Sequence, residues 1–401
     1  MKQKIQVLSI QEATERLIDY RGKTPPKSNG GVRLITAKVV KAGQILPEPA
    51  EYIASDYYDE WMRRGLPKKH DVLLTTEAPL GEVALLRSDE KIALAQRIIL
   101  LRARPDVMDA VFLFYALQSD YGRAELMARA SGTTVSGIKQ SELRQVRVPV
   151  FDLPVQRRIA GILSAYDELI ENRQRCIRIL EEMARKLYRE WFVHFRYPGH
   201  EGQRLVRSAL GEIPVGWEVA SLGDTCHLTM GQSPKSEFYN DAGIGSPFHQ
   251  GVSDFGDRFP SDRLYCTVDG RSAEAGDILF SVRAPVGRMN IANKQITIGR
   301  GLSAIRHLQG YQAFLWEQLR NRFTEVDMMG NGAIFAAVTK ADMEGIALLN
   351  PPVPLVARVE QLLIPIHAEL GLLSRKVDNL RRTRDLLLPR LLSGQIDVEA
   401  L

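Results

Sequence analysis

Basic and amide side chains gather in short turn segments in both halves of this 401-residue chain. Arginine and lysine can neutralise phosphates, while glutamine, threonine and asparagine carry donors and acceptors that distinguish base edges. In the first half the candidate residues are Arg21, Lys23, Thr24, Lys38, Thr76, Gln96, Arg97 and Thr133. In the second half they are Gln232, Lys235, His249, Gln250, Arg283, Arg300 and Asn331. Each one alone is more often a solvated surface group, so the argument depends on the set recurring on corresponding turns.

The candidate turns fall at corresponding positions of an internal repeat. Asp71-Val72-Leu73-Leu74 matches Asp277-Ile278-Leu279-Phe280, and further matches follow in the same order about 200 residues apart. The corresponding turns are Arg21–Pro25 with Met230–Pro234, Thr75–Glu77 with Ser281–Arg283, and Gln96 with Arg300. Apolar framework positions agree between the copies while the polar turn residues differ. This pattern is typical of two heads that share one scaffold and bind different sequences.

The sequence lacks several common motifs for catalysis and cofactor binding. It has no GxxxxGK[ST] or strand-linked GxGxxG loop, no HxxxH pair among its seven histidines, and no Glu-x-Lys tripeptide of the nuclease type. Asn350-Pro351-Pro352-Val353 is similar to the Asn-Pro-Pro-aromatic motif of amino-methyltransferases, but valine cannot stack on a flipped base. These observations favour recognition over catalysis, and we expect no metal site.

Composition indicates a mildly basic globular protein. Lys+Arg 53 against Asp+Glu 48 gives a net charge of +5, which permits a polyanionic partner without proving one. The three cysteines are far apart and form no CxxC pair, as is common in a reducing compartment. No apolar run approaches the roughly 18–20 residues that span a bilayer, and the N-terminal residues lack the apolar stretch of a signal peptide. We therefore expect a cytoplasmic protein.

The elements that must position the turns are short strands and a few helices. Apolar β-rich runs such as 72–74, 98–101 and 278–282 alternate with Gly, Pro, Ser and Asn turns, and amphipathic helices are predicted at 109–129 and 311–325. Scattered strands with few helices indicate an α+β fold rather than a regular β-α-β alternation. We therefore predict two similar globular recognition domains.

Each copy then continues into a long helix with apolar residues three and four apart. A 40-residue helix is about 60 Å long, so two such helices are expected to pair with each other as a coiled coil rather than to pack only on their own domains. Because the units are direct repeats, a closed two-fold pairing must be antiparallel and hold the heads a fixed distance apart. The predicted coiled-coil and subunit-docking residues are Ile159, Ile162, Tyr166, Leu169, Leu180 and Leu187 in the first helix and Val359, Leu362, Ile366, Leu373, Leu380 and Leu387 in the second.

These elements divide the chain into five predicted segments. They are a first recognition domain at 1–152, a central long helix at 153–195, a linker at 196–216, a second recognition domain at 217–352 and a C-terminal long helix at 353–396. The pair of helices between two heads has internal pseudo-two-fold symmetry in this interpretation.

In this order the motifs resemble the specificity (S) subunit of type I restriction-modification systems. Gly211-Glu212-Ile213-Pro214-Val215-Gly216-Trp217-Glu218 resembles the segment that opens a target recognition domain in that family. Residues 185–192, ending in Trp191-Phe192, resemble the end of its central conserved helix, and residues 386–396 resemble the C-terminal counterpart. The resemblance covers nearly the whole chain, while the N-terminus has no clear copy of the opening motif.

The resemblance implies a DNA-binding subunit that is not itself an enzyme. Each target recognition domain would bind one half of a split, asymmetric double-stranded DNA site, and the helical pair would set the spacer and dock two modification (methyltransferase) subunits. Two restriction subunits would join for ATP-driven translocation and cleavage. S-adenosylmethionine, ATP and Mg²⁺ would be used by the partner subunits, with no cofactor in this chain and no membrane partner.

Two other interpretations stay open from the sequence: a solitary DNA adenine methyltransferase, and a protein-interaction scaffold without a DNA role. Binding of S-adenosylmethionine by the isolated chain would support the first. A DNA-free complex that is insensitive to salt would favour the second.

Overall fold

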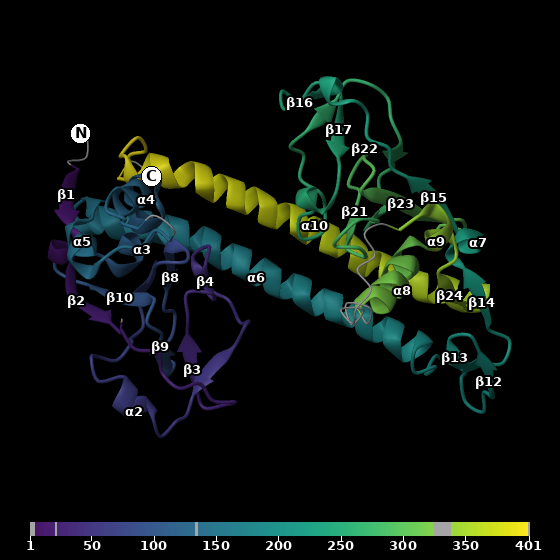
Figure 1. Cartoon of the computed structure of the whole chain (residues 1–401), viewed down its shortest axis with the longest axis horizontal. Coiled ribbons are helices and arrows are strands. Elements are labelled where there is room, and N and C mark those ends of the chain that lie inside the picture. The colour runs from purple at the N-terminus through teal and green to yellow at the C-terminus, as the bar shows by residue number, and fades with distance from the viewer. Residues whose placement is uncertain (1–4, 21, 133–134, 325–337, 400–401) are drawn as a thin grey trace. The chain divides into compact units, whose positions relative to one another are not determined.

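The chain forms two compact units, which are described separately. Figure 1 shows the computed structural model, which describes residues 5–20, 22–132, 135–324 and 338–399. One unit comprises Met1–Glu171 with Asn379–Leu401, and the other comprises Asn172–Asp378. Each unit combines a head of short strands and helices with parts of two long helices. The predicted α+β fold is therefore confirmed in both heads.

The head of the first unit is built around a four-stranded antiparallel sheet. Its strands are β1 (Gln6–Ser9), β2 (Thr14–Asp19), β3 (Val32–Ile35), β4 (Val40–Lys41), β5 (Gln44–Ile45), β6 (Glu51–Ile53), β7 (Val72–Thr76), β8 (Leu80–Leu85), β9 (Ile92–Leu94), β10 (Ile98–Ala103) and β11 (Arg147–Val150). Its helices are α1 (Ile10–Ala13), α2 (Tyr58–Trp61), α3 (Ala110–Gln118), α4 (Asp120–Ala128) and α5 (Gln140–Gln145). The central sheet has the order β2-β10-β7-β8, and β3 pairs with β9 in parallel beside β6.

The head of the second unit has the same central sheet, while its second sheet has five strands. Its strands are β14 (Glu218–Ser221), β15 (Cys226–Met230), β16 (Tyr239–Asn240), β17 (Ser246–His249), β18 (Tyr265–Cys266), β19 (Ser272–Ala273), β20 (Ile278–Ser281), β21 (Met289–Ile291), β22 (Ile296–Ile298), β23 (Leu302–His307) and β24 (Ala347–Asn350). Its helices are α7 (Leu222–Thr225), α8 (Gln312–Thr324) and α9 (Lys340–Glu344), with 3₁₀ turns η1 (Ser236–Phe238) and η2 (Val252–Asp254). The order β15-β23-β20-β21 repeats that of the first head, and β17 pairs with β22 in parallel as β3 does with β9. The second sheet has the order β16-β18-β17-β22-β19.

The central strands are apolar without interruption because both faces of the sheet are buried. In β10, Ile99 and Leu101 join one hydrophobic cluster with α3, while Ile98 and Leu100 join the cluster around Trp61 on the opposite face. Successive side chains of a strand point to opposite faces, so a strand covered on both sides needs apolar residues at every position. This explains why the sequence shows runs rather than alternation.

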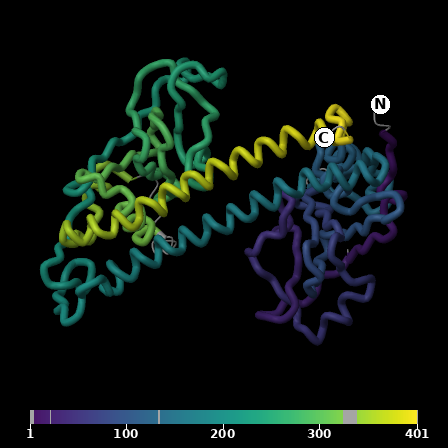
Figure 2. Tube along the Cα trace, turned by 180° about the vertical axis from the view of Figure 1, so that it is seen from behind, coloured from purple at the N-terminus to yellow at the C-terminus, as the bar shows by residue number. Residues whose placement is uncertain are grey.

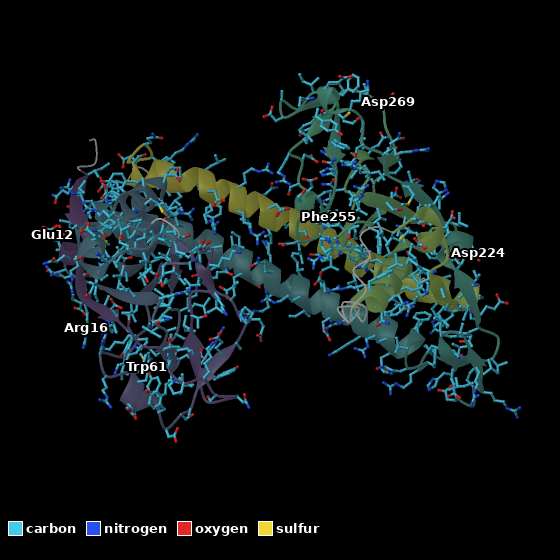
Figure 3. All side chains as sticks on the ribbon, in the orientation of Figure 1. Glu12, Arg16, Trp61, Asp224, Phe255 and Asp269 are labelled. Atoms are coloured by element: carbon cyan, nitrogen blue, oxygen red, sulfur yellow. The ribbon has the colours of Figure 1, made fainter. Side chains whose placement is uncertain are left out.

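Matched polar contacts confirm that the two heads are copies of one unit. Asp71 accepts two hydrogen bonds from Arg102 in the first head, and Asp277 accepts two from Arg306 in the second. Short helices α1 and α7 both begin with a capping box, closed by Glu12 in one head and by Asp224 in the other (Figure 3). Through their bonds to Arg102 and Arg306, Asp71 and Asp277 each hold two neighbouring strands together.

The prediction of one continuous helix at 109–129 is wrong, because the structure has two helices, α3 and α4, that meet at Ser119. Ser119 ends α3 in an extended conformation, and its hydroxyl accepts a hydrogen bond from the Gly122 amide to begin α4. A side chain at Gly122 would bring a Cβ within 2.3 Å of the Ala116 carbonyl oxygen, so only glycine permits this corner. The helix predicted at 311–325 corresponds to α8.

The long helices α6 (Leu153–Phe192) and α10 (Val353–Leu392) pair antiparallel in each unit (Figures 1 and 2). In the first unit, residues from the start of α6 share a cluster with Leu391 and Leu392 from the end of α10. In the second unit, Tyr188 and Phe192 from the end of α6 pack with residues from the start of α10. The predicted pairing of the helices is confirmed, and packing of each helix only on its own domain is excluded.

At two positions, the buried seam of the two helices lies one residue away from the predicted one. Ile159 and Val359 are fully buried, as expected, but Leu169 is 42% exposed and Leu362 is 46% exposed, while the following residues Ile170 and Leu363 are buried. The difference arises because the seam includes the polar Asp167 and the small Ala184, whereas the sequence pattern follows apolar residues alone. The remaining predicted residues Ile162, Tyr166, Leu180, Leu187, Ile366, Leu380 and Leu387 are half-buried, and Leu373 is buried.

The segment predicted as a linker contains a hairpin and an aromatic cluster. Strands β12 (Leu205–Ser208) and β13 (Gly211–Pro214) pair with each other. Trp217, from the motif that follows, is buried against Phe192, Phe195 and Tyr197 with ring centroids 5.4–5.8 Å apart. The motif thus joins the end of α6 to the beginning of the second head.

Candidate nucleic-acid interface

In the first head, backbone hydrogen bonds bring three of the predicted turns together. The Thr76 amide donates to the Arg97 carbonyl (3.0 Å), and the Ala95 amide donates to the Ile35 carbonyl (2.9 Å). The Ile138 amide also donates to the Thr76 carbonyl (3.0 Å). The turn that carries Gln96 and Arg97 is therefore fixed beside Thr76 and beside the segment that leads to Lys38.

The second head repeats this network at the corresponding positions. The Val282 amide donates to the Gly301 carbonyl (3.0 Å), the Gly299 amide to the His249 carbonyl (2.8 Å) and the Val338 amide to the Val282 carbonyl (2.8 Å). These bonds place Arg283, Gln250 and Arg300 on neighbouring turns. The turn containing Gln232 joins them, since its amide donates to the Ile298 carbonyl (3.0 Å) and the Ser233 hydroxyl accepts from the Arg300 amide (3.1 Å).

Glycines let the turns of the second head approach closely. A Cβ at Gly231 would lie 2.2 Å from the Gly299 carbonyl oxygen, and one at Gly301 would lie 2.4 Å from the Gln250 carbonyl oxygen. Any larger residue at these positions would force the segments apart. The glycines therefore determine the spacing of the polar side chains on this surface.

The exposed cations of the two heads differ in whether they form ion pairs with acidic residues. In the first head, Arg97 pairs with Glu77 (2.7 Å), and Lys38 shares Glu51 with Lys27, at 3.8 and 2.7 Å. Lys23 and Thr24 are exposed. Lys27 is not among the residues predicted from the sequence, where its only signal is its proximity to the Arg21–Pro25 turn.

In the second head, the exposed guanidinium groups of Arg283 and Arg300 make no hydrogen bond or ion pair with another described residue. Lys235 lies 3.9 Å from Glu237, and the Gln250 amide reaches the Ser233 hydroxyl at 3.5 Å. Unpaired arginines on rigid turns lose little when they exchange water for phosphate or a guanine edge. Among the predicted cations that the structure describes, these two arginines and Lys23 are therefore without a protein partner.

His249 is not on the surface, contrary to the direct contact expected from the sequence. Its side chain is 0% exposed, and Nε2 lies 3.1 Å from the Asp262 carboxylate, which also pairs with Lys294. Burial lowers the pKa of His249, against the opposing effect of Asp254 and Asp262. The backbone network places His249 at the position of the buried Ile35 in the first head. It supports the turn that presents Gln250.

Three predicted residues, Arg21, Thr133 and Asn331, lie outside the described residues.

A cavity of about 320 Å³ opens between the turns of the first head. Two predicted residues, Thr76 and Gln96, line it together with Gly22, Glu77, Ser131, Val135, Gly137, Ile138 and Lys139. Gly137 makes the junction possible, since its Cβ would lie 3.3 Å from both Glu77 Cβ and the Thr76 carbonyl oxygen. Lys139 is not among the residues predicted from the sequence, although the repeat match at Ser131-Gly132 lies only a few residues before it.

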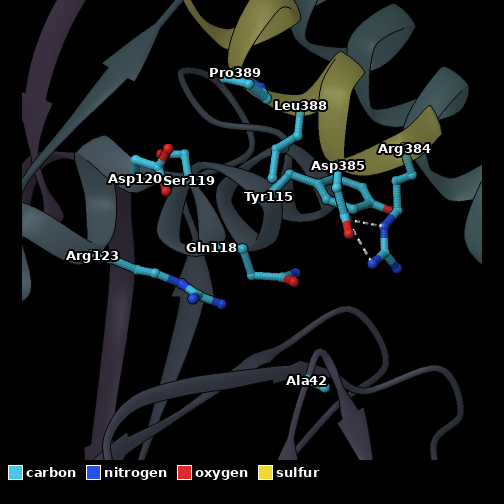
Figure 4. Close-up of a pocket in the computed structure, with 10 residues that line it drawn as sticks. All are labelled: Ala42, Tyr115, Gln118, Ser119, Asp120, Arg123, Arg384, Asp385, Leu388 and Pro389. Carbon is cyan, nitrogen blue, oxygen red and sulfur yellow. Dashed lines mark hydrogen bonds and ion pairs between the residues drawn. The ribbon is translucent and has the colours of Figure 1, made fainter. Parts of the chain in front are cut away.

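A second cavity, of about 290 Å³, lies in the first unit where the α3–α4 corner meets α10 (Figure 4). Gln118, Arg123 and Asp385 point into it. Arg384, in its wall, donates to Asp385 and to the buried Asp167, which also accepts a hydrogen bond from Tyr115 (2.6 Å). None of the residues predicted from the turns lines this cavity.

Comparison with known proteins assigns the chain to a family. A family model described as the type I restriction modification DNA specificity domain matches residues 19–181. A protein of Methanocaldococcus jannaschii named for the specificity subunit of the type I restriction enzyme MjaX is 30% identical over 333 residues, which cover 81% of this chain and 77% of that protein. The chain belongs to the type I restriction-modification specificity subunits.

One further relative and one solved structure are similar to this chain. The type I restriction enzyme MjaIX specificity subunit of the same organism is 26% identical, covering 83% of this chain and 79% of that protein. The crystal structure of the type I restriction-modification system S subunit from M. genitalium has the same fold, with a TM-score of 0.64 over 97% of this chain and 96% of that chain at 16% identity.

In the part of the specificity subunit that the structure describes, no three His, Cys, Asp or Glu side chains are grouped to hold a metal ion. Among the same residues, no helix has the length and apolar character needed to cross a bilayer.

Proposed function

We propose that this specificity subunit is the DNA sequence-recognition subunit of a type I restriction-modification complex, and that each head binds one half of a bipartite, asymmetric DNA site. The observation that carries the proposal is the contrast between framework and turns. The two heads share one hydrogen-bond network, yet Gln96 stands where Arg300 does, and Thr76 where Val282 does. Equal scaffolds with different donors and acceptors would bind different base sequences.

Phosphate contacts would supply much of the affinity in each head. Lys23, Lys38 and Arg97 of the first head, and Lys235, Arg283 and Arg300 of the second, are exposed on the converging turns. Lysine and arginine contacts to phosphate release counterions, so binding would weaken steeply as salt concentration rises. Arg300, which stands where Gln96 does, would also contact a base edge. Thr24, Gln96, Gln232 and Gln250 are the other described polar residues that we propose for base edges or for positioning.

The long helices would set the spacer between half-sites and dock the partner subunits. Leu169 and Leu362 are exposed on the helices rather than buried between them, which fits a surface that another protein covers. We propose that two modification subunits dock on the helices and that two restriction subunits complete the assembly, in the cytoplasm where the DNA is. S-adenosylmethionine, ATP and Mg²⁺ would serve the partners, and this chain would perform no catalysis.

The segment boundaries of the proposal follow the sequence pattern. Residues 1–152 and 217–352 would be the two target recognition domains, with the conserved helices at 153–195 and 353–396 and a linker at 196–216. The ends of α6 and α10 and the α+β content of both heads support this division.

The test is to produce the full chain with a modification subunit in a cell that lacks other adenine methyltransferases, and to map the methylated adenines. The expected result is one motif of two defined half-sites separated by an undefined gap of fixed length. A complex that methylates without such a motif would overturn the proposal. Binding of S-adenosylmethionine by the isolated chain would instead indicate a methyltransferase.

A further inference from the structure

The buried hydroxyl of Thr76 lacks a hydrogen-bond partner. Its Oγ1 atom bonds to no described residue, although the side chain is only 2% exposed and lines the 320 Å³ cavity of the first head. An unpaired hydroxyl in a buried position is unfavourable, so such a group in a native protein needs an explanation. Rotation of the hydroxyl toward the cavity would let a ligand there supply the missing partner.

The second head shows that the hydroxyl is not required by the fold. The backbone network places Val282 at the position of Thr76, with equal burial and nearly the same shape. Threonine and valine differ there by one hydroxyl in place of one methyl group. The neighbouring Thr75 differs from Thr76, because the Thr75 hydroxyl accepts a hydrogen bond from the Glu82 amide (2.9 Å). In the second head, the corresponding Ser281 hydroxyl accepts one from the Arg288 amide (2.8 Å).

The rest of the cavity offers neutral donors and acceptors. The Gln96 side-chain amide makes no hydrogen bond with another described residue, and Glu77 is neutralised by Arg97 at 2.7 Å. A phosphate in the cavity would lie against the Glu77 carboxylate. A planar base edge could instead form hydrogen bonds with the Thr76 hydroxyl and the Gln96 side-chain amide. Lys139, exposed at the rim, is free to contact the DNA backbone beside the base.

We propose that this cavity binds the edge of a single adenine in the first half-site, with Thr76 and Gln96 as the residues that specify it. This inference rests on the proposed function and specifies one base that the first head would recognise. Adenine is the base whose major-groove edge carries an adjacent donor and acceptor, and the carboxamide of glutamine matches that pair. The Thr76 hydroxyl adds a second donor or acceptor within the same cavity.

The experiment compares the DNA motif of the wild-type complex with that of complexes carrying Thr76→Val or Gln96→Met. We expect the wild-type motif to contain an adenine in its first half that both variants cease to require, with the second half unchanged. In competition between duplexes that differ at this position, discrimination should fall roughly 5- to 150-fold. The unfolding midpoint of Thr76→Val should be equal to or above that of the wild type.

Thr75→Val is the matched control, because it makes the same chemical change at a hydroxyl that has a partner. It should lower the unfolding midpoint and leave the motif intact. Gln96→Met decides the outcome if Thr76→Val fails to fold. A wild-type bipartite motif that both variants retain overturns this inference alone, as does relaxation at a base other than adenine. A wild-type complex with no bipartite motif overturns the proposed function and this inference together.

Discussion

At the scale of single residues, the two heads differ most in which cations are already paired. Arg97 is held by Glu77, whereas Arg300 and Arg283 are exposed and make no ion pair with another described residue. A guanidinium that gives up no protein partner binds a phosphate or a base edge at lower cost. The second head should therefore depend more strongly on individual arginines than the first.

The first prediction concerns Arg300. Arg300→Ala should weaken binding of the bipartite DNA by roughly 1–3 kcal/mol and relax base preference in the second half-site alone, because a base contact is lost. Titration of duplexes with altered second half-sites measures both effects. Arg204→Ala, which removes one exposed charge from the segment between the heads, is the charge-matched control and should leave base preference unchanged. Equal affinity and an unaltered motif in Arg300→Ala would remove this residue from the interface.

The second prediction concerns the pH dependence of stability in the second head. Burial lowers the pKa of His249, so the unfolded chain takes up a proton on this residue at higher pH than the folded head does. The contribution of His249 to the free energy of unfolding should therefore decrease as the pH falls below about 6.5, the ordinary pKa of histidine. Asp262 and Asp254 face the ring and reduce the effect without reversing it, and Lys294 favours the neutral form.

His249→Leu isolates this contribution, since the first head has the apolar Ile35 at the same position. Denaturant unfolding of the wild type and the variant between pH 7.5 and pH 5 should show a smaller loss of stability in the variant. The difference between the two slopes removes the effect of His307, whose pKa is also lowered by burial. Parallel slopes would show that His249 keeps its ordinary pKa in the folded head.

At the scale of elements, polar side chains fix how helices meet the heads. In the first unit, Asp167 on α6 accepts hydrogen bonds from Tyr115 of α3 and Arg384 of α10, both at 2.6 Å. In the second unit, Glu360 on α10 accepts hydrogen bonds from the Ala313 and Phe314 amides at the start of α8, and burial raises its pKa. A carboxylate from a long helix thus fixes α3 in the first head and α8 in the second.

The third prediction separates the two aspartates that bind Arg384. Asp167→Ala should destabilise the first unit by about 3 kcal/mol, because it leaves the Tyr115 hydroxyl and one side of a guanidinium without an acceptor in a buried position. Asp385→Ala removes the exposed partner of the same arginine and should cost less than about 1 kcal/mol. Equal losses in chemical denaturation would mean that burial of Asp167 adds nothing.

These contacts also explain what the sequence could predict. The repeat, the α+β class, the turns around Gln96 and Arg300 and the existence of both long helices follow from apolar framework positions, which the two copies share. The buried seam was displaced because Asp167, Glu360 and Ala184 are not apolar residues of the kind that a heptad pattern counts. Their burial depends on partners from distant segments, which spacing along one helix does not contain.

Contacts between distant segments also decide which predicted residues of the site are exposed. His249 has the residue type of a DNA contact, but its burial is determined by the parallel pairing of β17 with β22, a non-local feature. The cavity around Thr76 likewise depends on Gly137 and Ile138 returning to the end of β7. A sequence pattern identifies which turns correspond, whereas the fold decides which of their side chains face outward.

At the scale of the whole molecule, the proposed spacer function makes the helix length the quantity to alter. The Asp167–Arg384 pair indicates which parts of α6 and α10 lie opposite each other, so residues 169–175 and 376–382 form matched seven-residue segments. Removing both keeps each helix face nearly in phase, because seven residues are close to two turns. It shortens the pair by about 10 Å at 1.5 Å per residue.

The fourth prediction is that this double deletion shortens the undefined gap of the methylated motif by about three base pairs, at about 3.4 Å per pair, and leaves both half-sites unchanged. Mapping methylated adenines in cells that carry the shortened subunit measures the gap directly. A length-neutral control, in which the exposed Lys376 and Arg382 become alanine, should retain the original gap. An unchanged gap, or altered half-sites with the same gap, would mean that the helices do not set the spacing, and that the heads find their half-sites through the partner subunits instead.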